Sequence, residues 1–84
     1  MALIVYGRKV REDAAEVAYA FGRTPDVTDG VVVILAGRLD EWRVEPGPGG
    51  ALPGAERQAA RVAWKALRTY RATGSWPLDA THYA

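Results

Sequence analysis

The spacing of hydrophobic positions changes along the chain, and each spacing predicts a different element. Residues 2–6 and 31–36 are apolar runs rich in β-branched residues, which predicts two strands. Both faces of the second run are apolar, which indicates a central strand. In residues 39–44 the pattern alternates, with Trp42 and Val44 on one face, and this is typical of a half-exposed edge strand. The sequence therefore predicts a three-stranded sheet.

Two further segments have the spacing of helices. Residues 13–22 begin with Asp13 and Glu16 at capping-box distance, and their apolar residues recur at helical intervals until Gly22. Residues 55–73 predict a longer helix whose apolar face is rich in alanine. The expected order is β-α-β-β-α, an α+β fold in which two helices pack on one face of the three-stranded sheet.

The length of the chain bounds its organisation. Eighty-four residues are expected to form one small domain, 1–84, with a modest core. Within it, the Pro- and Gly-rich residues 45–54 predict a flexible loop, and residues 75–84 an irregular tail. Two helices on one face leave a second apolar row, with Val32 and Ile34, facing water. We therefore expect a homodimer that covers this row, or else a tail that folds over it.

Positive charge gathers on one side of the second helix. Its five basic residues fall within an arc of about 120° when plotted at about 100° per residue. They are Arg57, Arg61, Lys65, Arg68 and Arg71. Trp64 lies in the same arc, where a core residue is not expected. The net charge is only +1, but residues 1–56 have an acidic excess and residues 57–84 a basic one. This asymmetry predicts an anionic partner for the C-terminal half or electrostatic docking between the halves.

Little in the sequence supports catalysis. There is no cysteine, which excludes disulfides and cysteine-based zinc sites. His82 is the only histidine and Ser75 the only serine, and a terminal tail rarely gives such a pair a rigid frame. Glu12, Asp13 and Glu16 could hold a hard cation, but helix capping explains two of them better. Alternatively, this acidic face could meet the basic side of the long helix in a neighbouring subunit. We predict no catalytic residue, no metal site and no cofactor.

These observations favour a small non-catalytic binding module that acts through a partner protein or through its own dimer. Trp64, Trp42 and Trp76 are the candidate interface residues, because aromatic side chains are frequent hot spots. The alternative function is binding of nucleic acid or another polyanion by the basic side of the long helix. A solvated helix face, with Trp64 packed under the tail or in a dimer interface, explains the same residues without a ligand.

The expected location follows from what the sequence lacks. No apolar stretch is long enough to span a membrane, and the N-terminus has no signal-peptide pattern. Together with the lack of cysteine, this predicts a cytoplasmic protein without membrane contacts. The abundance of alanine, glycine and arginine is typical of proteins from GC-rich bacteria or their phages.

Overall fold

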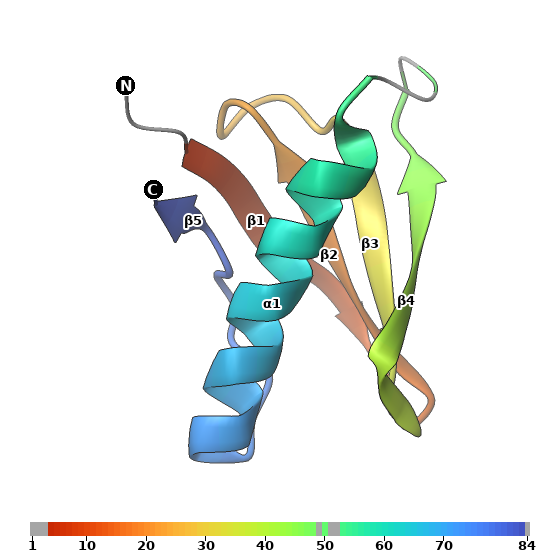
Figure 1. Cartoon of the computed structure of the whole chain (residues 1–84), viewed down its shortest axis with the longest axis vertical. Helices are drawn as coiled ribbons and strands as arrows, with labels where there is room; N and C mark the ends of the chain where they lie inside the picture. Colours follow the sequence, from red (N-terminus) through yellow and green to blue (C-terminus); the bar gives the residue numbers. More distant parts are fainter. Residues whose placement is uncertain (1–3, 49, 51–52, 84) are drawn as a thin grey trace.

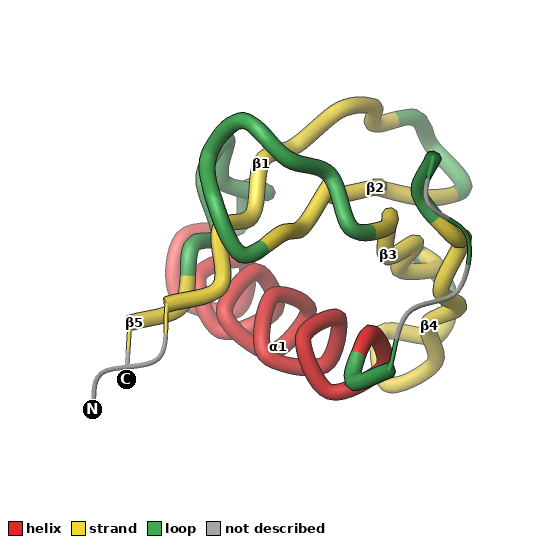
Figure 2. Tube along the Cα trace, turned by 90° about the horizontal axis from the view of Figure 1, so that it is seen from above, coloured by secondary structure: helices red, strands yellow, loops and turns green. Residues whose placement is uncertain are grey.

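The computed structural model describes residues 4–48, 50 and 53–83, so the expected loop 45–54 and tail 75–84 lie partly outside the described residues. The elements are β1 (Ile4–Glu12), β2 (Glu16–Gly22), β3 (Gly30–Leu35), β4 (Arg38–Pro46), α1 (Ala55–Thr73) and β5 (His82–Tyr83). The strands pair antiparallel in the order β4-β3-β2-β1-β5. The sheet curls into a half-barrel around α1 (Figure 1 and Figure 2).

This mostly β architecture shows that the expected β-α-β-β-α order is wrong. Residues 13–22 form a turn and strand β2 rather than a helix, so one helix covers a five-stranded sheet. The hydrogen bond expected of a helix cap is nevertheless present. The Asp13 carboxylate accepts from the N–H groups of Ala15 and Glu16 at 2.7 and 2.9 Å. It closes a hairpin instead, because the Asp13 N–H donates to the Glu16 carbonyl.

Strand β2 is the middle strand of the sheet, and its burial explains the wrong prediction. Val17, Tyr19 and Phe21 belong to the core beneath α1. Ala18 and Ala20 alternate with them and are also buried, on the opposite face. A strand buried on both faces lacks the polar alternation that marks strands in a sequence. Its alanines are also good helix formers, so the local pattern favoured the wrong element.

Helix α1 fills the concave side of the sheet. Its buried residues are Ala59, Val62, Ala63, Ala66 and Leu67. They share one core cluster with Val32 and Ile34 of β3. These two residues were expected to face water, and the structure corrects that expectation. The helix also comes close to β1, since a Cβ atom at Gly7 would lie 2.8 Å from Val62 Cγ1.

The convex side of the sheet is covered by its own charged side chains. Ala18 and Val33 are fully buried there. They lie between Arg11 of β1 and Arg43 of β4 in one row of cross-strand neighbours. The convex network consists of Arg11, Glu16, Arg43 and Glu45. Each of its arginines pairs with each of its glutamates at N–O distances of 3.2–3.8 Å. Because pairs reach from β1 to β4, they cross over the buried residues of β2 and β3.

The tail lies along the edge of β1 and against the end of α1. The Lys9 N–H donates to the Leu78 carbonyl at 2.9 Å, and β5 continues the pairing toward the start of β1. Trp76 stacks on Tyr70 of α1, with ring centroids 4.2 Å apart and planes 12° apart. The tail thus docks at a sheet edge rather than over an apolar row. Since Val32 and Ile34 are buried under α1, the apolar row that was the reason for expecting a homodimer does not face water.

Candidate functional site

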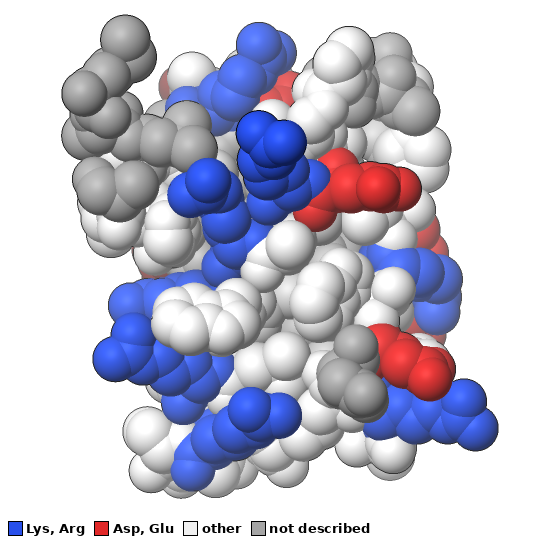
Figure 3. Space-filling model, in the orientation of Figure 1, with Lys and Arg blue, Asp and Glu red and all other residues white. Residues whose placement is uncertain are grey.

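The outer face of α1 is the surface that the sequence singled out, and the helix is oriented as predicted. Its alanine-rich side is buried against the sheet. The basic stripe, on the opposite side, consists of Arg57, Arg61, Lys65, Arg68 and Arg71. Three of these arginines are exposed, whereas Arg61 and Lys65 are half-buried. Figure 3 shows Lys and Arg side chains following the helix along its length.

The cations of the basic stripe have no carboxylate partners. Among the residues that the structure describes, none of the five lies within 4.0 Å of an Asp or Glu oxygen. Of the six other Lys and Arg residues, only Arg8 shares this property. Arg61 instead donates to Nε2 of His82 at 3.3 Å, which requires that nitrogen to be unprotonated. The positive charge of the stripe is therefore not neutralised within the described part of the chain.

Trp64 lies within the stripe with 58% of its surface exposed. The guanidinium carbon of Arg68 is 5.5 Å from the indole centroid, which is a cation–π contact. Trp64 and Arg68, with Leu67 and Arg71, line a shallow hollow of about 420 Å³. The hollow brings together an aromatic face, an aliphatic side chain and two guanidinium groups.

The three candidate tryptophans lie in different surroundings. Trp42 is 38% exposed and, as the cross-strand neighbour of Ile34, points to the concave side of the sheet. It lines a separate hollow between β4 and α1. Trp76 is half-buried by its stacking on Tyr70. Trp64 therefore offers a partner the most aromatic surface of the three.

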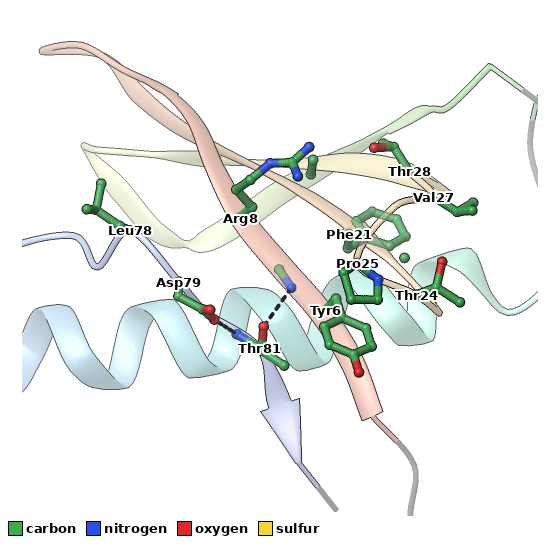
Figure 4. Close-up of a pocket in the computed structure, with 13 residues that line it drawn as sticks. Tyr6, Arg8, Phe21, Thr24, Pro25, Val27, Thr28, Leu78, Asp79 and Thr81 are labelled. Carbon is green, nitrogen blue, oxygen red and sulfur yellow. Dashed lines mark hydrogen bonds between the residues drawn. The ribbon is translucent and has the colours of Figure 1, made fainter.

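A smaller pocket, which sequence reasoning missed, lies between β1, the loop 23–29 and the tail (Figure 4). The loop passes so close to the end of β2 that a Cβ atom at Gly22 would lie 1.9 Å from the Val27 carbonyl oxygen. Gly22 is thus required by a close contact, whereas the sequence predicted a helix that ends at this residue. No local pattern predicts this pocket, because three distant segments form it.

This pocket has polar groups but little room. They belong to Tyr6, Arg8, Thr24, Thr28, Asp79 and Thr81. The Asp79 carboxylate already accepts from the Thr81 N–H at 2.7 Å, and the Thr81 hydroxyl accepts from the Gly7 N–H at 3.2 Å (Figure 4). The volume is about 170 Å³, below that of a usual ligand site. The pocket has room for only a few ligand atoms, so it is a weaker candidate for a contact surface than the outer face of α1.

The groups with shifted pKa values are structural and lie away from the stripe. Hydrogen bonds from the backbone of Ala15 and Glu16 lower the pKa of Asp13. Burial raises the pKa of the Tyr19 phenol, whose hydroxyl donates to the Pro77 carbonyl at 2.6 Å. Within the described residues, no group of three His, Asp or Glu side chains is arranged to hold a metal ion.

Comparison of the chain with protein-family models, with curated proteins and with solved structures finds no match. None of the helical segments in the described part of the chain has the length and apolar character needed to cross a membrane.

Proposed function

We propose that the protein is a small non-catalytic binding module whose contact surface is the outer face of α1. The partner presents negative charge to this surface. The observation that carries the proposal is the basic stripe, whose five cations have no carboxylate partner among the described residues. A protein partner and a polyanion, the two functions considered from the sequence, would both use this face.

The requirements of folding do not explain the stripe. Arg57, Arg61 and Lys65 follow one another at intervals of four residues, and like charges at this interval destabilise a helix by a few tenths of a kcal/mol per pair. On the convex side of the sheet, arginines are instead balanced by glutamates. An uncompensated row of cations favours a role in attracting an anionic partner.

The scaffold suits recognition by a fixed surface. The stripe lies on a helix of 19 residues whose opposite face is buried in the core. A preformed surface loses less conformational entropy on binding than a loop that must first become ordered. Binding here therefore needs no rearrangement of the backbone.

Matched pairs of substitutions test this proposal. Arg57→Gln with Arg68→Gln removes two charges from the stripe, and Arg8→Gln with Arg38→Gln removes two charges elsewhere. Immobilised heparin serves as the polyanion probe. We expect the stripe variant to elute at clearly lower salt than the wild type, and the control variant to elute close to it. If both variants eluted at equally lowered salt concentrations, only net charge would matter, and this would contradict a specific contact surface.

The homodimer and the cytoplasmic location stay predictions within this proposal. The exposed rings of Trp42 and Trp64 are the remaining support for self-association. Sedimentation equilibrium of the wild type and of Trp64→Ala checks the dimer, because an interface through this residue would weaken in the variant. The lack of cysteine supports a reducing compartment.

A further inference from the structure

We infer that the partner is a single-stranded nucleic acid, with phosphates along the basic stripe and a base stacked on Trp64. This inference rests on the proposed function and names the chemistry of the partner. It depends on three properties of the outer face of α1: the linear arrangement of its cations, the predominance of arginine, and the hollow beside Trp64.

The cations form a line rather than a cluster. From Arg57 to Arg71 the helix rises about 21 Å, at about 1.5 Å per residue. A line of charge matches a polymer that carries one negative charge on every unit. Four of the five cations are arginine, whose planar guanidinium group binds phosphate oxygens in a bidentate manner. The stripe therefore has the charge and the geometry to follow a phosphate backbone.

The hollow beside Trp64 provides a place for a base. The indole is 58% exposed, and it lines the hollow together with Arg68, Arg71 and the largely buried Leu67. Arg68 and Arg71 border the same hollow, where they can bind the phosphates that flank a stacked base. An unpaired base has a free aromatic face for such stacking. In a duplex the bases stack on one another, so Trp64 would meet only sugars and phosphates.

An acidic protein segment is the competing partner. It would satisfy the cations, but it would leave unexplained why an exposed indole lies between guanidinium groups in the middle of the stripe. Every nucleotide of a nucleic-acid strand carries both a phosphate, which the cations can bind, and a base, which the indole can stack on. The arrangement therefore favours the nucleic acid, and an acidic peptide becomes an outcome of the test.

The test measures binding of a fluorescent oligothymidylate of about 20 nucleotides by anisotropy, beside a duplex of equal length and a poly-glutamate peptide. We expect the single strand to bind most tightly. If all five cations meet phosphates, the logarithm of its binding constant should fall with that of the salt concentration with a slope of about −3.5. Trp64→Ala should weaken binding about 5- to 150-fold. Trp64→Phe, which keeps an aromatic face, should restore most of the affinity, and Trp42→Ala should have no effect.

The outcomes separate this inference from the proposed function. Tighter binding of the duplex or of poly-glutamate, or no effect of Trp64→Ala, overturns the inference. The proposed function survives that result if Arg57→Gln with Arg68→Gln still weakens binding of the preferred probe more than the control pair does. If the stripe variant and the control variant bind every probe with the same affinity, the proposed function fails as well. Circular dichroism of Trp64→Ala confirms that a loss of affinity is not a loss of fold.

Discussion

Arginine serves different purposes on the convex face of the sheet and on the outer face of α1. On the sheet, Arg11 and Arg43 pair with Glu16 and Glu45 at 3.2–3.8 Å and cover buried residues. On the helix, none of the five cations of the basic stripe lies within 4.0 Å of an Asp or Glu oxygen in the described structure. The same residue type is therefore paired with carboxylates on one side of the described structure and has no carboxylate partner there on the other.

The difference comes from the register of the strands and from the distribution of acids. Strand pairing places Val31 beside Glu45 and Val33 beside Arg43, so charges of opposite sign alternate along β4. Acidic residues are absent between Arg57 and Leu78 in the sequence, so α1 cannot balance its own cations beyond its first turn. A structural arginine and a candidate binding arginine thus differ in whether a carboxylate lies within reach of the guanidinium group.

The largest expected effect distinguishes the two sides of β3. Val32→Asp places a carboxylate among the alanines of α1, where it has no partner, and should unfold the domain, because an unpaired buried charge costs about 3–5 kcal/mol. In the wild type Val33 is as buried as Val32, but its cross-strand neighbour is Arg43, so the carboxylate of Val33→Asp would have a cation beside it. Thermal melts followed by circular dichroism should show a folded Val33→Asp protein with a lowered Tm. A Val33→Asp protein as unfolded as Val32→Asp would show that the convex network cannot neutralise a charge there.

A second prediction exchanges charge on the two arginine surfaces. Arg11→Glu with Arg43→Glu should lower the free energy of unfolding by about 1–2 kcal/mol, because it replaces partly exposed ion pairs with repulsion, and should leave binding intact. Arg61→Glu with Arg68→Glu changes net charge equally. It should leave stability nearly unchanged, because Arg68 is exposed and, among the described residues, the polar contact of the Arg61 side chain is with His82. It should abolish binding of anionic probes. Urea unfolding and heparin elution of both variants measure this, and the reverse assignment of effects would refute the comparison.

A smaller effect concerns charge on the concave side, where Tyr19 lies beneath α1. Burial raises the pKa of its phenol, so the folded protein holds this proton above pH 10, where the unfolded chain releases it. Its contribution to stability is therefore complete below about pH 10, the ordinary pKa of tyrosine, and is lost as the pH rises further. Tyr19→Phe loses the hydrogen bond to Pro77 but should show a flatter stability profile between about pH 9 and 11. An equally steep decline in Tyr19→Phe would assign the alkaline sensitivity to another group.

Elements with a clear local period could be predicted from the sequence. The β-branched run of β3, the alternation in β4 and the amphipathic spacing of α1 each predict the element that the structure contains. The prediction of a helix over residues 13–22 was wrong, since a doubly buried strand that contains alanines lacks polar alternation and can show helical spacing instead. The two residues of β5 are also too few to carry a pattern, and their pairing depends on where the tail docks.

The candidate site was predictable in part for the same reason. Helical geometry alone places the five basic residues and Trp64 on one face, once the alanine-rich side is taken as buried. The absence of ion pairs could not be predicted, because it depends on which strands bring Glu16 and Glu45 to the far side of the sheet. The prediction that Val32 and Ile34 face water was wrong, since both rows of β3 are apolar and the run itself does not show which row meets the helix. Small residues in β2 and charged ones in the flanking strands decide it.

The central claim is that the outer face of α1 is the contact surface, and a chemical-shift map tests it most directly. The 15N-labelled protein is titrated with oligothymidylate while the backbone amides, the three indole N–H groups and the arginine Nε–H groups are followed. We expect the Trp64 indole and the amides on the stripe side of α1 to shift, while Arg11 and Arg43 stay in place. Shifts confined to the convex face or to the pocket of Arg8, or no shifts at all, would contradict the account.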